Sequence, residues 1–328
     1  MQKVNVGRLM GMVFLLMVFV VVGVAQAQGS AYPRKPVKFI CAVSAGAAAD
    51  LTGRALVEAV KPFLPQPVAV VNKPGGAGSL GTADVVQSAP DGYTIGQGYG
   101  PAVCLQPYLN KDLPYRGPQD IQPIVSMGAA PIVIASKSDA PWKTLQEMVA
   151  YAKANPGKIR GGSAGIGSIS HIMLEELKRA AGVDITHVPF AGSAPSVPAL
   201  LGGHIEISLA NPTPFLPHVQ SGAMRALGVY EDERIPVFPD TPTLKELGYV
   251  VHNLGSYYFV FAPKGTPKNV VQILYDAFLK AEKSQAYQKW CKDNGMRLDY
   301  KGPDDLKKTL DNDYAFYADL LKRGVKLK

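Results

Sequence analysis

The stretch VKFICAVSAGAAADLTGRALVEAVKPF, residues 37–63, determines the fold that the sequence predicts. It begins with a short apolar strand at residues 37–43 and continues through a loop of small residues, SAGAAAD. A helix follows, because Leu51, Ala55, Ala59 and Phe63 have the spacing of one helical face. A second strand, PVAVVN at residues 67–72, a loop KPGGAGS and a helix through residues 82–87 complete the unit. This order is typical of parallel βαβ units.

The same order of elements returns in the second half of the chain. A loop, GGSAGIGSISH at residues 161–171, leads into a helix whose apolar face is predicted to hold Ile169, Ile172, Met173, Leu177 and Ala180. The strand DITHVPF at residues 184–190, the loop AGSA and a helix through residues 197–201 follow. We therefore predict an α/β protein of two lobes. Each lobe has a mostly parallel sheet with flanking helices, and ligands bind in the cleft between the lobes, beyond the strand ends.

The first 27 residues are predicted to be a cleaved signal peptide. Lys3 and Arg8 precede an apolar run at residues 9–24, and Ala25-Gln26-Ala27 fits the small-x-small pattern of signal-peptidase sites. The run is shorter than the roughly 20 residues that a membrane span requires. We expect an exported, periplasmic protein.

Apolar strands at residues 130–136 and 255–263 indicate how the chain passes between the lobes. The helix that begins near Pro267 follows the second lobe, so the chain is expected to return to the first lobe to finish. The predicted boundaries are residues 28–127 and 250–328 for lobe 1 and residues 128–249 for lobe 2. Two crossings would form a hinge.

Composition argues against several classes of function. The formal charge is +8, but it is spread along the chain, without the basic stripe and interleaved aromatics that indicate a nucleic-acid partner. Three cysteines are too few for a disulfide framework. The histidines lack metal-ligand spacing, and we expect neither metal nor cofactor; they are His171, His187, His204, His218 and His252.

The glycine-rich loop at residues 161–171 fits three enzyme motifs incompletely. A phosphate-binding P-loop would need lysine where Ser168 stands. A dinucleotide fingerprint would need an acid at the end of the next strand, but Asp184 stands at its beginning.

The third motif leaves a secreted serine hydrolase as an alternative. Ser163 lies in a G-x-S-x-G elbow, and Asp184 followed by His204, His218 or His252 gives the required order. Against it, the preceding segment NPGKIR is short and polar, the loop continues before the helix begins, and no HGGG-type segment lies upstream.

The loop also has the composition of an anion site. The first amides of a helix lack partners and carry partial positive charge, and small residues let a ligand approach them. Similar loops occur at residues 44–49, 75–79 and 191–194. Several helix N-termini meeting at one cleft could bind a small acid.

From residue 32 almost to the end, the sequence resembles the Bug-type extracytoplasmic receptors of the tripartite tricarboxylate transporters. The resemblance rests on YPRKPVKFI, AVSAGAAAD, PVAVVNKPGGAGSLGT, APDGYTI, GSAGIGSISH, HVPFAGSAPSVPALLGGHIEISLAN, PVFPDTPTLKELGY and FVFAPKGTPKNVV. It implies a monomeric receptor without catalytic activity, which captures a small carboxylate and delivers it to a membrane permease. A receptor that presents its ligand to a signalling partner is a further alternative. The implied ligand-binding residues are Ser44, Ala45, Gly46, Ala47, Ala48, Ala49, Ser163, Gly165, Gly167, Ser168, Phe190, Gly192, Ser193, Ala194 and Asn211.

Three features of these loops refine the expectation. Asp50 is expected to cap its helix and not to contact the anion. The methyl groups of Ala47, Ala48 and Ala49 narrow a loop that is usually richer in glycine, which favours di- or aromatic carboxylates over a bulky hydrated group. Ala210 stands where the family commonly has an acid, which argues against amino-acid ligands.

Overall fold

The computed structural model describes residues 32–251 and 256–322. The chain divides into an N-terminal segment, Met1–Arg34, and one compact unit, Lys35–Lys328, which is described below. The predicted signal peptide and His252 lie outside the described residues. Within the described ranges no helix has both the length and the apolar character that crossing a membrane requires.

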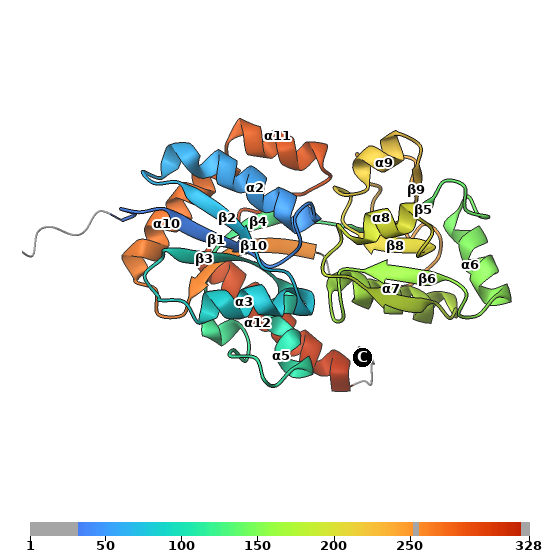
Figure 1. Ribbon diagram of the computed structural model, residues 1–328, viewed down its shortest axis with the longest axis horizontal. Helices are drawn as coiled ribbons and strands as arrows, with labels where there is room; N and C mark the ends of the chain where they lie inside the picture. Colours follow the sequence, from blue (N-terminus) through green and yellow to red (C-terminus); the bar gives the residue numbers. More distant parts are fainter. Residues whose placement is uncertain (1–31, 252–255, 323–328) are drawn as a thin grey trace, which may run out of the picture. The chain divides into compact units, whose positions relative to one another are not determined.

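Two five-stranded sheets organise the compact unit (Figure 1). The strand order of the first sheet is β2 (Val68–Asn72), β1 (Val37–Cys41), β3 (Thr94–Tyr99), β10 (Ser256–Pro263) and β4 (Ile121–Ala130). The order of the second is β7 (Thr186–Pro189), β6 (Arg160–Ser163), β8 (Ile207–Ala210), β5 (Ile132–Lys137) and β9 (Met224–Tyr230).

The two sheets repeat one pattern. In each sheet three successive strands pair in parallel, with the first of them between the other two. The remaining two strands are antiparallel, and one of them, β10 or β5, joins the edge of the parallel group. The sheets are therefore mixed, because β10 and β5 enter from the other sheet and not from a βα unit of their own. This repetition confirms the internal resemblance between the two halves of the sequence.

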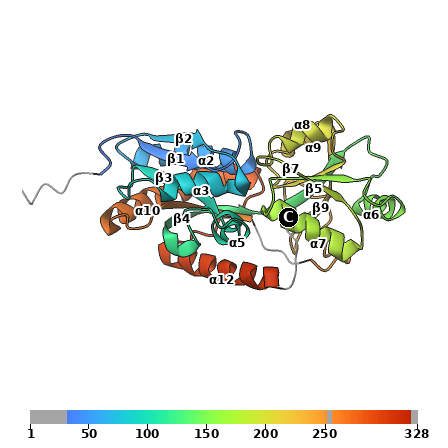
Figure 2. The same cartoon turned by 60° about the horizontal axis from the view of Figure 1, so that its bottom comes forward.

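Helices cover both faces of each sheet (Figures 1 and 2). Around the first sheet they are α2 (Ala48–Val60), α3 (Ser79–Val86), α4 (Gly100–Cys104), α5 (Gln106–Leu109), α10 (Lys268–Glu282), α11 (Gln285–Asp293) and α12 (Pro303–Lys322). Around the second they are α6 (Leu145–Ala154), α7 (Ile169–Ala181), α8 (Ser196–Leu201) and α9 (Leu216–Gln220). Short 3-10 turns occupy Lys61–Phe63, Gly76–Gly78 and Pro118–Asp120.

The buried face of α2 differs from the predicted one. Leu51, Ala55 and Ala59 are only half-buried and Phe63 is exposed, whereas Leu56, Val57 and Val60 are buried, with Thr52 and Gly53 beside them. The helix begins at Ala48, and its larger apolar side chains lie on the buried face. The helix as a whole contacts α10, α11 and strands of the first sheet. On α7 the predicted face is buried except for Ala180, which is half-buried.

The chain passes from the first sheet to the second at Pro131, since β4 continues to Ala130 and β5 begins at Ile132. It returns between β9 and β10. Along β5, Ile132 and Ile134 pack into one apolar core and Val133 into another, because alternate side chains point to opposite faces of a strand. The lobe boundaries given above remain predictions.

Candidate functional site

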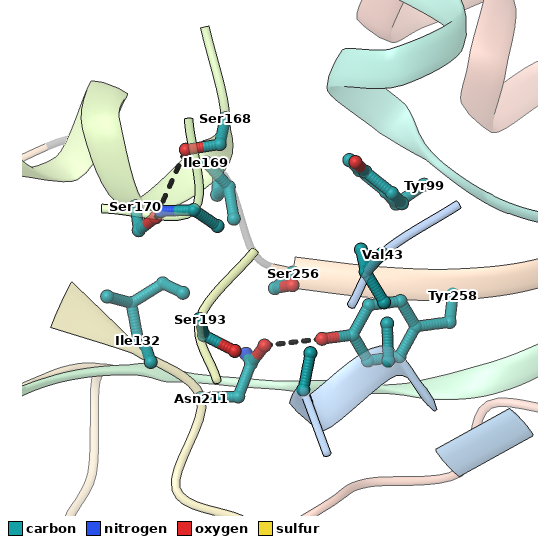
Figure 3. Close-up of a pocket in the computed structure, with 14 residues that line it drawn as sticks. Val43, Tyr99, Ile132, Ser168, Ile169, Ser170, Ser193, Asn211, Ser256 and Tyr258 are labelled. Carbon is teal, nitrogen blue, oxygen red and sulfur yellow. Dashed lines mark hydrogen bonds between the residues drawn. The ribbon is translucent and has the colours of Figure 1, made fainter. Parts of the chain in front are cut away.

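A cavity of about 50 Å³ lies between residues of the two sheets. The first sheet and its loops contribute Val43, Ala47, Ala49, Tyr99, Ser256 and Tyr258. The second sheet and its loops contribute Ile132, Ala164, Ser168, Ile169, Ser170, Ser193, Ala210 and Asn211 (Figure 3). Among the described residues, no charged side chain lines this cavity. Its polar groups are hydroxyls and one amide.

The N-terminus of α2 reaches the cavity without a side-chain cap. Its N-cap residue is Ala47, whose methyl group cannot accept hydrogen bonds from the first-turn amides. A thirteen-residue helix concentrates partial positive charge, equivalent to about half an elementary charge, at such an end. Because Ala47 and Ala49 line the cavity, this helix end can receive an anion there.

Asp50 lies in the same helical turn but is turned away from the cavity. Its buried carboxylate accepts hydrogen bonds from the Gly46 amide at 2.9 Å, the Asn72 amide group at 2.8 Å and the guanidinium of Arg54 at 2.9 Å. Burial alone would raise the pKa of Asp50, but these hydrogen bonds lower it below its usual value. The carboxylate therefore holds the loop at residues 44–50. The expectation that Asp50 caps the helix was wrong, because the N-cap is Ala47 and no side chain caps the first turn.

Hydroxyl groups mark the other side of the cavity, at the start of α7. Ser168 is the N-cap of this helix and accepts a hydrogen bond from the His171 amide at 3.2 Å. Its Oγ lies 3.1 Å from that of Ser170, which also accepts from the Ala164 amide. Each serine has one proton, and their mutual bond uses only one. One O–H donor thus remains for a ligand.

Asn211 and Tyr258 connect the two sheets at the cavity. The hydroxyl of Tyr258, on β10, donates to the amide oxygen of Asn211 (Figure 3). The amide nitrogen of Asn211 donates to the carbonyl oxygens of Pro131 at 2.8 Å and Ala130 at 3.3 Å. Because both amide protons are used, Asn211 fixes the crossing between β4 and β5. Tyr257, the residue before Tyr258, does not line the cavity, and its hydroxyl donates a hydrogen bond to the carboxylate of Asp313.

The other residues expected at the site lie around the cavity without lining it. Ser44 has a buried hydroxyl for which the described residues offer no partner. Glycines allow loops from the two sheets to approach closely. A Cβ built on Gly165 would lie 3.5 Å from Ala77, and one built on Gly46 would lie 3.8 Å from Ala194. The remaining members of the expected set are Ala45, Ala48, Ser163, Gly167, Phe190 and Gly192. Ligand contact by any of these fifteen residues remains a prediction.

Ser163 contacts a histidine that the motif analysis had not paired with it. Its Oγ lies 2.6 Å from Nε2 of His187, while Ser163 itself is 0% exposed and does not line the cavity. Ser163 is the last residue of β6, an internal strand. The strand that leads into the elbow is therefore short, as expected, but it is internal to the sheet, which was not expected. The loop does run on to Ile169 before the helix begins, as expected.

His187 stacks against His171 beneath this loop, with ring centroids 3.8 Å apart. The Gly167 amide donates to Nδ1 of His171 at 3.0 Å, which places the proton of the neutral ring on Nε2. Burial is the main reason that the pKa of each histidine falls to about 4. Both rings are therefore neutral at pH 7, and they support the loop from below.

All three cysteines are buried free thiols. Burial raises the pKa of Cys41 to about 12, as expected of a small apolar core residue. In the described part of the chain, no cluster of three or more histidine, cysteine, aspartate or glutamate side chains could hold a metal ion.

Comparison with known proteins identifies the family. The sequence profile of the tripartite tricarboxylate transporter family receptor matches residues 52–323. The chain belongs to this family. It is a periplasmic solute-binding protein, because the family consists of such receptors.

Relatives and solved structures agree with this assignment. A Cupriavidus necator protein, "UPF0065 protein in gbd 5'region", is 39% identical over 257 residues, which are 78% of this receptor and 77% of that protein. The periplasmic binding protein BugD is 30% identical, with a TM-score of 0.81 over 89% of this chain and 98% of its own. MatC from Rhodopseudomonas palustris, solved with bound malate, is 27% identical, with a TM-score of 0.82 over 88% and 99%. These structures confirm the two-lobed periplasmic-binding-protein fold.

The sequence missed most of the cavity lining. Tyr99, Ser256 and Tyr258 stand at the ends of β3 and β10, outside every glycine-rich loop. Because alternate side chains of a strand point to opposite faces, only Tyr258 of the pair Tyr257 and Tyr258 lines the cavity. The antiparallel pairing that brings β10 beside β3 has no local signal.

Proposed function

We propose that this receptor binds a small carboxylic acid in the cavity and delivers it to the membrane permease of a tripartite transporter. The observation that carries the proposal is the uncapped N-terminus of α2 at a cavity lined by hydroxyls. The amides of Ala48 and Ala49 and the hydroxyls of Ser168 or Ser170 would donate to the carboxylate. The bound malate of MatC, a relative of the same fold, supports a carboxylate ligand.

The lining also favours some acids over others. Val43, Ile132 and Ile169 form apolar walls, which suit the carbon skeleton of a dicarboxylate or an aromatic acid. Ala210 lines the cavity, and no carboxylate does so among the described residues. The ammonium group of an amino acid would therefore be buried without a counter-ion, which is costly. We propose that amino acids bind more weakly than acids of the same length that lack the ammonium group.

Thermal unfolding of the mature protein, residues 28–328, tests the proposal. The panel contains malate, succinate, adipate, citrate, benzoate, phthalate, aspartate and glutamate. A ligand at 100 times its dissociation constant stabilises the folded state by about 2.7 kcal/mol, which raises Tm by several degrees. A selective shift by one class of acid supports the receptor function. The carboxylate assignment fails if no acid shifts Tm after dialysis under denaturing conditions and refolding.

We also propose that the receptor has no hydrolase activity. The hydroxyl of Ser163 faces His187 inside the protein and not the cavity. Replacement Ser163→Ala would abolish turnover in a serine hydrolase. We expect the wild-type protein to hydrolyse none of a panel of p-nitrophenyl esters, so that the variant changes nothing. Turnover that disappears in Ser163→Ala would contradict the proposal.

A further inference from the structure

The two sheets are joined at the rim of the cleft by a hydrogen bond outside the cavity. Nε2 of Gln106, the first residue of α5, donates to the carbonyl oxygen of Ile166 at 2.9 Å. Gln106 is 6% exposed and belongs to the helices of the first sheet, whereas Ile166 is at the tip of the loop between β6 and α7. Gln106 does not line the cavity.

Both ends of this bond are held in place by their own lobes. On the first side, Tyr108 of α5 stacks on Tyr314 of α12, with ring centroids 4.8 Å apart. On the second side, the Ser168 amide donates to the Gly165 carbonyl at 3.0 Å. The Gly167 amide donates to His171. These bonds fix the loop so that the Ile166 carbonyl is directed away from its own lobe, toward Gln106.

Gly167 makes the approach sterically feasible. Its φ of +72° lies in the left-handed region, which residues other than glycine rarely adopt. A Cβ built on Gly167 would lie 2.6 Å from Nε2 of Gln106 and 2.8 Å from Cδ1 of Leu109. A side chain at this position would therefore push α5 and the loop apart. Because Gly167 has no side chain, there is room for the amide group of Gln106 to reach the Ile166 carbonyl.

We propose that Gln106 is a positioning residue that latches the receptor in its closed form. The inference rests on the proposed function, ligand capture by closure of the two lobes. When the lobes separate, the amide and the carbonyl both become hydrated, so the bond contributes only to the closed form. A neutral hydrogen bond of this kind changes an equilibrium roughly 2- to 12-fold. Ligand affinity follows, because apparent affinity is proportional to the fraction of receptor in the binding-competent form.

Two substitutions separate the latch from a general loss of packing. Gln106→Ala removes the donor, and Gln106→Glu keeps the shape but places carboxylate oxygens against the Ile166 carbonyl. We expect both variants to release ligand faster, with Gln106→Glu the more severe. Gln272→Ala is the matched control, because this exposed glutamine of α10 also donates a hydrogen bond, to Asp276 at 2.9 Å, but within its own helix and not across the two sheets.

Energy transfer between dyes on the two lobes measures closure directly. Dyes attached to Lys153→Cys on α6 and Lys280→Cys on α10 report the distance between the lobes. Labelling is selective for these positions because both lysines are exposed and the native cysteines are buried. The closed fraction is measured without ligand and with each acid of the panel, malate included. We expect Gln106→Ala to lower the ratio of closed to open receptor 2- to 12-fold and to raise the dissociation rate similarly, while Gln272→Ala changes neither.

The latch and the carboxylate assignment can fail separately. If no acid binds the wild-type receptor, the proposed function is wrong, yet the closed fraction of the ligand-free variants still tests the latch. If the closed fractions of wild type and Gln106→Ala are equal in every condition, including zero, Gln106 is not a latch. Weaker binding at an unchanged closed fraction would also overturn it, because Gln106 would then act on the ligand.

Discussion

Gly192 shows at the scale of one residue how the two lobes meet. It has a φ of +117°, and a Cβ built on it would lie 2.7 Å from the hydroxyl oxygen of Ser44, on the opposite loop. We expect Gly192→Ala to weaken ligand binding about tenfold, because the methyl group keeps the loops at residues 44–49 and 191–194 apart. Titration calorimetry with the acid that stabilises the wild type measures the loss.

The control for this substitution is Gly222→Ala. Gly222 also has a positive φ, +76°, but a Cβ there would meet nothing within 4 Å. Both variants should lose about 1–3 kcal/mol of stability to backbone strain. Only Gly192→Ala should lose affinity. Equal affinities in the two variants would show that the approach of Gly192 to Ser44 has no part in closure.

At the same scale, the pairing of Ser163 with His187 shows what a motif search omits. The search considered only histidines from residue 204 onward. His187 also follows Asp184 in the chain, and it reaches Ser163 through the parallel pairing of β6 and β7. In that register Gly161 is opposite His187, and Ser163 lies two residues further along on the same face. The sequence contained both strands but not their register. The sequence therefore could predict the glycine-rich loop but not the two stacked histidine rings that support the loop.

Glu282 at the end of α10 has a consequence for the stability of that element. The residue is 0% exposed, and neither carboxyl oxygen has a hydrogen-bond partner among the described residues. Burial, and secondarily the charge of Asp299, raises the pKa of Glu282 to about 9. The folded protein therefore keeps this carboxyl protonated at pH 7, whereas the unfolded chain does not. Folding must take up a proton, at a cost that grows with pH.

We expect Glu282→Gln to raise the free energy of unfolding at pH 8 and to have little effect near pH 4.5. A single group shifted in this way changes stability by at most about 1.4 kcal/mol per pH unit. Urea unfolding at four pH values measures the difference, with Asp276→Asn, exposed on the same helix, as the control. A constant difference between Glu282→Gln and wild type across this range would mean that Glu282 is ionised in the folded protein.

The elements themselves were predictable where sequence spacing is local. Strands β1, β2, β5, β7 and β10 and helices α2, α3, α7, α8 and α10 all occur where they were expected. The prediction of the buried face of α2 was wrong. Alanines at four-residue intervals resemble an apolar stripe, but Leu56 and Val60 are the larger side chains that the helix buries. The antiparallel halves of the sheets were not foreseen, since pairing between distant strands depends on the crossings and not on local composition.

For the whole molecule, we predict a maximum of stability near pH 6.5, which results from the titration of Glu282, His171 and His187. Between pH 4.5 and 6.5, the unfolded chain binds protons at His171 and His187, whose folded pKa values are about 4, and lacks the proton that the folded state holds at Glu282. The net uptake on unfolding is about one proton, so stability falls as the pH is lowered through this range. Between pH 6.5 and about 8, Glu282 contributes with the opposite sign, and stability falls as the pH rises. Above about pH 8 the three cysteines add to this decline, because burial raises their pKa values and the unfolded chain loses their protons first. Asp50, whose pKa is lowered, loses its contribution only at more acidic pH.

Urea unfolding of the receptor from pH 4.5 to 8 tests this balance, because the buried cysteines add to the decline only above this range. In Glu282→Gln the decline between pH 6.5 and 8 should disappear, and the slope below pH 6.5 should double to about two protons. His187→Phe retains an aromatic ring against His171 but removes one titrating group, so its slope below pH 6.5 should approach zero. His204→Gln, at an exposed position, should follow the wild type. A wild-type curve without a maximum, together with an unchanged slope in His187→Phe, would mean that the stacked histidines are not held neutral by folding. The loop above them would then lack the uncharged support on which its geometry depends.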